Sequence, residues 1–141
     1  MYEYKFKVLR VIDGDTVDGI IDLGFNVLLK ERVRLYGINA PETRLQRSIK
    51  DIKERKLEKT RGLKAKDRLK QILTDAEKQP EGLYIETFLD KKGKYGRVLG
   101  DIKYVYARDL HNNQPNEKPW VGWKSIGAQL LQEGLVKQYN K

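Results

Sequence analysis

The chain has 141 residues, enough for a single domain around one hydrophobic core. Its 29 Lys and Arg residues outnumber its 20 Asp and Glu residues, so polyanions are the expected partners of a protein with net charge +9. The absence of cysteine excludes a disulfide framework, a thiolate nucleophile and a thiolate metal site. Because there is neither a long apolar stretch nor a charged-then-apolar leader, we expect a soluble, cytoplasmic protein without membrane partners, and we also expect a monomer.

Three strands, connected as a meander, are predicted before residue 37. Apolar and polar side chains alternate loosely over residues 4–12, and a second strand is predicted over 16–22, with an Asp-Gly-Asp turn signal between the two. Beyond a turn at 24–26, residues 27–36 are rich in Val, Leu and aromatic side chains with charges interleaved. That composition is typical of a longer third strand.

The centre of the chain holds most of the positive charge and predicts a helix. Residues 44–70 contain twelve basic and four acidic residues and so supply +8 of the net charge, which favours steering of a polyanion. Residues 44–59 carry Leu45, Ile49 and Ile52 at helical spacing and then become almost wholly charged, so we interpret them as a basic insertion that is at best an amphipathic helix and is a candidate for mobility. From Thr60 an amphipathic helix is predicted, with its apolar face formed by Ala65, Leu69, Ile72, Leu73 and Ala76.

A hairpin and a loop are predicted next. Residues 83–89 and 97–105 have the pattern of two strands, with a turn at 90–96 between them. The region 107–123 is rich in Asn and Pro up to residue 119 and is predicted to be a surface loop that ends in a Trp pair. For the tryptophans, core packing is favoured over base stacking or an oligomer contact.

A last helix closes the chain. Ser125 is its predicted N-cap, and Gly134 its predicted end. Its expected buried residues are Ile126, Leu130 and Leu131. The whole order, three strands, a helix, two strands and a helix, predicts an α+β, mainly β fold, in which residues 1–141 form a single five-stranded barrel of the OB type with two or three helices.

The turn Asp13-Gly14-Asp15 has two explanations. Asp-Gly is a common hairpin turn, so the sequence can be purely structural. A calcium loop of the helix-loop-helix type is excluded, because Val17 and Asp18 stand where that loop needs a third ligand and a glycine.

Arg34 and Glu42 also have ordinary explanations. Arg34 lies opposite the apolar face of the third strand, where arginines are usually solvated. Glu42 follows the turn at 39–41, where its carboxylate could return to the strand end, but it could equally be an acid near the N-terminus of a helix. The segment Lys94–Arg97 could be a hairpin turn with a basic, solvated tip. Together, however, acidic oxygens for a hard cation and arginines for phosphate suit phosphodiester cleavage.

The three motifs resemble those of the calcium-dependent thermonucleases, the staphylococcal-nuclease-like family. The resemblance rests on Val11–Val17, Arg34–Thr43 and Lys94–Arg97, in the order and with the separations of that family. With Gly134–Val136 near the end, it spans about residues 4–139. It implies an OB-type barrel that hydrolyses DNA, and RNA as a further substrate, with Ca²⁺, leaving 3′-phosphate ends.

The resemblance also implies roles for individual residues. Asp15 corresponds to a direct metal ligand, Asn39 occupies the place of a second acidic ligand, and Asp13 is a supporting group. Tyr139 lies near the base-stacking tyrosine of the family, one residue out of alignment. In full, the implied metal ligands are Asp15, Asn39 and the Ala40 carbonyl, the catalytic residues are Arg34, Glu42 and Arg97, and the substrate-binding residues are Lys94, Tyr95 and Tyr139.

Asn39 departs from the family pattern, which has aspartate there. An amide oxygen can coordinate calcium but brings no negative charge, so weaker metal binding is expected. This feature favours a second hypothesis, a non-catalytic OB-type module that binds nucleic acid. Against it, the retention of Arg34, Glu42 and Arg97 favours an enzyme, because a glutamate would hinder a mere phosphate binder. A structural or membrane-surface protein would explain the basic stretch but not the motifs.

Overall fold

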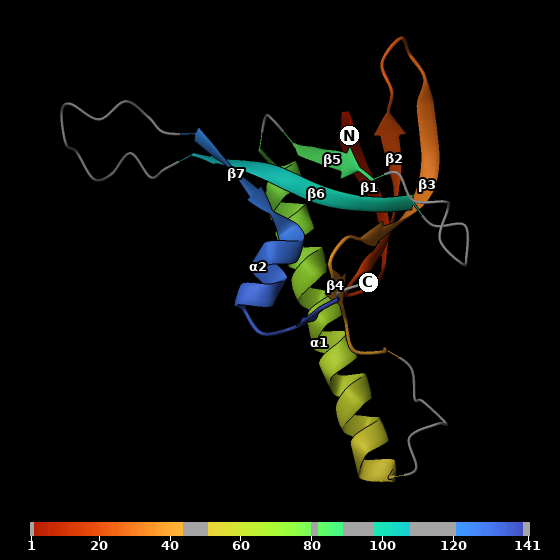
Figure 1. The fold of residues 1–141 in the computed structure, drawn as a ribbon, viewed down its shortest axis with the longest axis vertical. Helices are drawn as coiled ribbons and strands as arrows, with labels where there is room; N and C mark the ends of the chain where they lie inside the picture. The colour runs from red at the N-terminus through yellow and green to blue at the C-terminus, as the bar shows by residue number, and fades with distance from the viewer. Residues whose placement is uncertain (1, 44–50, 80–81, 89–97, 108–120, 140–141) are drawn as a thin grey trace, which may run out of the picture.

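A closed β-barrel forms the body of the protein, and two helices pack beside it (Figure 1). The structure is a computed structural model, which describes residues 2–43, 51–79, 82–88, 98–107 and 121–139. In chain order the elements are β1 (Tyr2–Asp13), β2 (Thr16–Asp22), β3 (Leu28–Leu35), β4 (Ile38–Asn39), α1 (Ile52–Glu77), β5 (Leu83–Thr87), β6 (Val98–Ala107), β7 (Val121–Ser125), α2 (Ile126–Gln132) and β8 (Lys137–Gln138). Neither described helix is of the long, apolar kind that could cross a membrane.

The barrel contains the five predicted long strands. They follow the order β3-β2-β1-β5-β6, and a parallel pairing of β3 with the start of β6 closes the circle. In that pairing Val33 lies beside Val98 and Arg34 beside Leu99. The far half of β6 pairs with β7, and β4 and β8 form a separate two-stranded ribbon. The predicted OB-type, mainly β fold is therefore confirmed.

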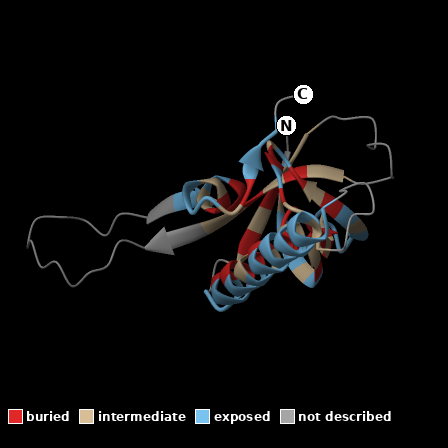
Figure 2. Cartoon of the chain, turned by 90° about the horizontal axis from the view of Figure 1, so that it is seen from below, coloured by how far each residue is buried: buried red, intermediate tan, exposed pale blue. Residues whose placement is uncertain are grey.

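The hydrophobic core lies inside the barrel and between the barrel and the helices. Buried residues line the inner strand faces and one side of α1, whose other side is exposed (Figure 2). The five residues predicted for the apolar face of α1 are all buried. In α2, Ser125 is the N-cap, and Ile126 and Leu130 are buried as predicted. Each fully buried leucine or isoleucine contributes about 1.5–3 kcal/mol of transfer free energy.

α1 begins before the stretch from Thr60 in which the amphipathic pattern is clear. Its first residue is Ile52, and the Asp51 side chain caps the helix by accepting a hydrogen bond from the backbone N–H of Lys53. Residues 52–59, interpreted as part of a basic insertion, form its first two turns. They are rich in Lys, Glu and Arg, which favour helix without an apolar face, and this end of α1 extends beyond the barrel (Figure 1). Residues 44–50 lie outside the described part of the chain.

Both ends of the predicted loop at 107–123 belong to strands in the structure. β6 continues to Ala107, and residues 121–123 belong to β7. Trp123 is 52% exposed, and its ring meets that of Tyr84 edge-on with 4.9 Å between centroids. The core interpretation is therefore wrong for Trp123, because the outer part of β7 extends past the barrel. Trp120 and the rest of 108–120 lie outside the described residues, as does the turn at 90–96.

A candidate active site beside the barrel

Asp15 connects three segments of the chain. It lies in the turn between β1 and β2, after a bulge that precedes Asp13, and it is only 7% exposed. Its Oδ1 accepts a hydrogen bond from the Thr16 hydroxyl at 2.9 Å, and its Oδ2 accepts one from the backbone N–H of Ala40 at 2.8 Å. The same Oδ2 lies 2.8 Å from Nη1 of Arg34. A buried carboxylate thus joins the turn to β3 and to the chain after β4.

Arg34 bridges the two side chains that the resemblance predicts to be metal ligands. As predicted, it lies opposite the core face of β3, but its side chain is only 14% exposed, so it is not a solvated surface arginine. Nη2 donates a hydrogen bond to Oδ1 of Asn39 at 3.2 Å. Nη1 is buried at ion-pair distance from Asp15 yet is not directed for a hydrogen bond to any described residue. The donor capacity of Nη1 is therefore unused within the described residues, and its charge faces the Asp15 carboxylate.

Glu42 lies next to this cluster and is exposed. Partial burial raises the pKa of its carboxyl, the negative charges of Asp13, Asp15 and Glu58 raise it further, and Arg34 opposes them. Its backbone N–H donates to Oε1 of Glu58 on α1 at 3.4 Å. α1 begins at Ile52, so Glu42 is not an acid of the first turn of α1, and residues 44–50, where a helix beginning near Thr43 would lie, are outside the described residues.

Asp13 supports the segment that carries Glu42. Its Oδ1 accepts a hydrogen bond from the hydroxyl of Thr43 at 2.8 Å. Asp13 therefore holds the residue after Glu42, whereas Asp15 holds Ala40, two residues before it. The Asp-Gly-Asp turn thus fixes the short segment 40–43 from both sides.

Small residues allow α1 to touch the site directly, and sequence analysis missed their role. A Cβ on Gly62 would lie 2.1 Å from the carbonyl oxygen of Glu42, so only glycine permits this contact. A Cβ on Gly14 would lie 2.8 Å from Cβ of Ala65 and 2.9 Å from Cβ of Ala40. The helix therefore fixes both the turn and the Glu42 segment. The only sequence signal was a glycine in a helix interior, which is unfavourable unless packing requires it.

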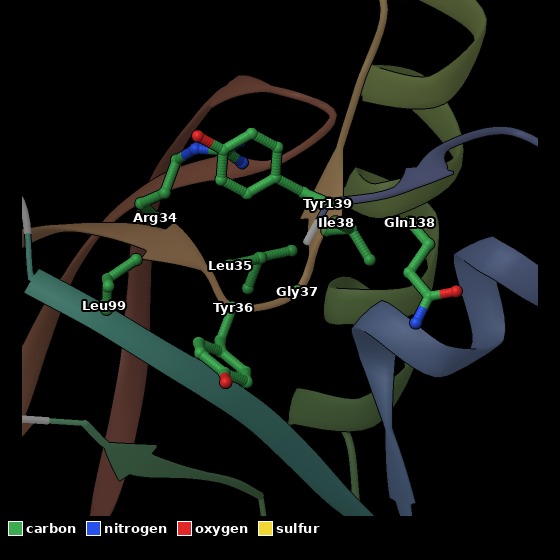
Figure 3. Close-up of a pocket in the computed structure, with 8 residues that line it drawn as sticks. All are labelled: Arg34, Leu35, Tyr36, Gly37, Ile38, Leu99, Gln138 and Tyr139. Atoms are coloured by element: carbon green, nitrogen blue, oxygen red, sulfur yellow. The ribbon is translucent and has the colours of Figure 1, made fainter. Parts of the chain in front are cut away.

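A pocket of about 470 Å³ opens beside Arg34 (Figure 3). Arg34 and the ring of Tyr139 lie together in it, with 5.9 Å from the guanidinium carbon to the ring centroid. The backbone N–H of Tyr139 donates to the carbonyl of Gly37 at 2.9 Å. Tyr36 also lines the pocket, and its ring stacks on Phe88 at 4.1 Å between centroids. Half-exposed aromatic rings beside a cation suit the base and phosphate of a nucleotide.

Several residues of the pocket were not predicted to be site residues. Tyr36 could have been found, since it follows Arg34 by two residues in a strand and so shares its face. Leu99 and Gln138 gave no local signal, because the pairing of β6 with β3 and of β8 with β4 brings them here. The predicted residues Lys94, Tyr95 and Arg97 lie outside the described residues.

The donor atoms of the cluster suit a hard cation only in part. Among the described residues no three His, Cys, Asp or Glu side chains are grouped to hold a metal ion. Calcium also binds amide oxygens, carbonyl oxygens and water. The Asn39 side chain and the Ala40 carbonyl are therefore suitable ligand types, together with the Asp15 carboxylate. Arg34, however, contacts the side-chain oxygens of both Asp15 and Asn39. A cation held there would share those oxygens with the guanidinium.

Comparison with known families places these observations beside a described family. A family model described as staphylococcal nuclease homologue matches residues 32–141. The match begins within β3, so Asp13 and Asp15 precede it, and the pairing of Thr16 with Arg34 brings them to the matched part. No curated protein matches the sequence.

Proposed function

Because the chain belongs to the staphylococcal nuclease family, we propose that it is a calcium-dependent nuclease that hydrolyses phosphodiester bonds in DNA, with RNA as a further substrate, and leaves 3′-phosphate ends. The observation that carries the proposal is the bridge from Arg34 to both Asp15 and Asn39, with Glu42 beside it. It joins in one place an arginine, a carboxylate, an amide and a candidate base from three segments of the chain.

Arg34 stabilises the transition state. Hydrolysis passes through a five-coordinate phosphorus, whose equatorial oxygens carry extra negative charge. Arg34 lines the pocket at Tyr139, and its planar guanidinium has the fork geometry that matches phosphate oxygens and never loses its proton near neutral pH. Arg97 is the second arginine in this proposal, on the basis of the resemblance. It directly precedes Val98, the first residue of β6, which pairs with Val33.

Calcium belongs to the proposal as the family's cofactor. Asp15, Asn39 and the Ala40 carbonyl would hold it, and Asp13 would support the site through Thr43. When bound, the ion polarises the phosphoryl oxygen and neutralises developing charge. Asn39 lowers the charge of this ligand set, so weaker calcium binding than with two aspartates is part of the proposal.

Glu42 orients and deprotonates the attacking water. A positioned general base contributes roughly a hundredfold to ten-thousandfold. The raised pKa of its carboxyl brings the residue closer to neutral pH, where a base accepts a proton more readily. The only histidine of the chain, His111, is far along the sequence in 108–120, so a carboxylate is the natural base.

The substrate nucleotide is placed by the pocket at Tyr139. Tyr139 and Tyr36 offer ring surfaces, and Arg34 offers charge at the same place. Lys94 and Tyr95 are proposed as phosphate contacts from the resemblance alone. Because ring stacking tolerates every base, little sequence preference is expected.

The second candidate function is binding of nucleic acid without cleavage. Asn39 favours it, because a site with one fewer negative charge holds a cation less strongly. Glu42 opposes it, because an exposed carboxylate beside the phosphate site repels a bound anion.

Incubation of the pure protein with single-stranded DNA separates the two functions. We expect cleavage with calcium, none with a chelator, and products that carry 3′-phosphates. Glu42→Gln is the matched control, with a loss of roughly 10² to 10⁴ in rate and retained binding. Binding without cleavage by the wild type would support the module, and cleavage that survives chelation would overturn the metal assignment.

A further inference from the structure

A second pocket, of about 460 Å³, lies next to the candidate active site. Its walls are residues 39–41, residues 134–137 and one side of α1, with Glu58, Arg61 and Lys64. It shares Asn39 and Ala40 with the cluster around Asp15. A ligand in this pocket therefore lies beside the atoms proposed to hold calcium.

Among the described residues, the lining of this pocket carries more positive than negative charge. Arg61, Lys64 and Lys137 line it, and Glu58 is the one acidic residue of that described lining; its Oε1 accepts a hydrogen bond from the backbone N–H of Glu42. All three cations are exposed, and within the described ranges none forms an ion pair. By contrast, Arg32, Arg68 and Lys103 each pair with a carboxylate within 2.8 Å. Free cations around a concave surface attract anions.

The β4–β8 ribbon connects this pocket to the one at Tyr139. Ile38 pairs with Gln138, and both line the Tyr139 pocket. Asn39 pairs with Lys137, and both line the basic pocket. Since neighbouring residues of a strand point to opposite faces, the ribbon separates the two pockets, and the Arg34–Asn39 hydrogen bond lies at the junction.

We propose that the basic pocket binds the phosphodiester backbone of the substrate on the far side of the scissile phosphate from the Tyr139 pocket. The substrate class is then a polynucleotide strand that extends in both directions from the cleaved bond, which is the substrate of an endonuclease. Arg61, Lys64 and Lys137 contact phosphates and not base edges, so they add affinity without sequence preference. This inference rests on the proposed function for the position of the scissile phosphate.

The test is a binding measurement in a chelator, so that it does not depend on cleavage. The variant Arg61→Gln/Lys64→Gln is compared with Lys59→Gln/Lys70→Gln. The control removes the same charge from the same helix, at positions about 120° or more around its axis from both Arg61 and Lys64. Gln is a good helix former, so α1 remains intact in both variants. The probes are a fluorescent 12-nucleotide oligothymidylate and a thymidine dinucleotide with a 5′-phosphate.

We expect the pocket variant to bind the 12-mer at least tenfold more weakly, and the control variant to bind it as the wild type does. A plot of log affinity against log salt concentration should become less steep. The magnitude of its negative slope should decrease by roughly 1.4, the value for two lost phosphate contacts to a single strand. The affinity for the dinucleotide should not change. That ligand is expected to occupy the Tyr139 pocket, and it is too short to reach the basic pocket as well. Adding Lys137→Gln should deepen the loss for the 12-mer.

Two results would overturn the inference. One is unchanged affinity and salt slope for the 12-mer, and the other is an equal loss in the control variant, which would indicate general attraction to a basic protein. Failure of the proposed function would give a different result. The wild-type protein would bind the 12-mer through this pocket but would never cleave it with calcium, which refutes the nuclease and not the pocket.

Discussion

The Arg34 cluster and the basic pocket use positive charge in opposite ways. In the cluster Arg34 is 14% exposed, and its charge is matched by Asp15 and fixed by Asn39. In the basic pocket Arg61, Lys64 and Lys137 are exposed and unpaired within the described residues. A partly buried, fixed charge acts strongly over a short distance, whereas exposed charges attract a polyanion from afar and are screened by salt. The cluster therefore suits chemistry, and the basic pocket suits capture.

The sharpest test of the cluster is Arg34→Lys. Lysine keeps the charge but loses the planar fork, so it cannot contact Asp15, Asn39 and a phosphate together. We expect kcat/KM for single-stranded DNA to fall by roughly 10² to 10³, the loss typical of removing one donor that stabilises a transition state.

Arg32→Lys is the matched control for that experiment. Arg32 lies two residues earlier in β3 and pairs with Asp18, but its side chain is 50% exposed. Its replacement should leave kcat/KM nearly unchanged. Equal losses in the two variants would show that the strand needs arginine in general, and a small loss in Arg34→Lys alone would show that charge without geometry suffices.

Gly62→Ala tests whether α1 positions the cluster. In an ordinary exposed helix the change stabilises by up to about 1 kcal/mol. Here the new Cβ would lie 2.1 Å from the carbonyl oxygen of Glu42, so we expect the free energy of unfolding to fall by about 1–3 kcal/mol, with a loss of activity. Urea denaturation measures the change.

Gly127→Ala in α2 is the control for Gly62→Ala. A Cβ there would meet its nearest atom at 3.7 Å, an ordinary contact, so the protein should become no less stable. If Gly62→Ala were neutral or stabilising, α1 would not lie against the Glu42 segment as described.

Local sequence patterns predicted the barrel well and the site only in part. Alternation identified the five barrel strands, because each buries one face, and the spacing of Ala65, Leu69 and Ile72 identified the core face of α1. Periodicity did not distinguish a helix from a mobile insertion over the charged first turns of α1, because those turns contain no buried residue. The half-exposed Trp123 was misjudged for a related reason, since a strand that extends past the barrel needs no core.

The contacts within the candidate active site could not be predicted from the spacing of motifs along the sequence. The resemblance named Asp15, Arg34, Asn39 and Glu42, and the structure brings these four together. That Arg34 contacts both Asp15 and Asn39 depends on strand register, which no local pattern encodes. Gly62 was missed because its importance is a contact with a segment twenty residues earlier.

Asn39→Asp increases the negative charge of the cluster around Arg34. A second carboxylate adds negative charge to the proposed ligands, so calcium affinity should rise by about tenfold, measured by calorimetry without nucleotide. The gain is limited because a carboxylate also attracts Arg34, which already contacts this side chain. Asn26→Asp, in the exposed turn between β2 and β3, is the control and should not change calcium affinity. Equal affinity in wild type and Asn39→Asp would exclude residue 39 as a ligand.

The smallest expected effect lies where the cluster meets the basic pocket, at Glu58. Its negative charge contributes to the raised pKa of Glu42, after burial and the charges of Asp13 and Asp15. Glu42 acts as a base only when ionised, so the rate should fall as the pH drops through its raised pKa. Glu58→Gln removes one of the charges that raise it, and the acidic limb of the profile of kcat against pH should therefore move to lower pH.

Because glutamine keeps an oxygen to accept the hydrogen bond from the Glu42 backbone, the Glu58→Gln variant separates charge from geometry. The 12-mer affinity of this variant should rise as well, since it removes the one acid that lines the basic pocket in the described part of the chain. A shifted pH profile with unchanged affinity would assign Glu58 to the cluster alone. Higher affinity with an unchanged profile would show that the charge of Glu58 does not raise the pKa of the group that sets the acidic limb, and would assign Glu58 to the basic pocket alone.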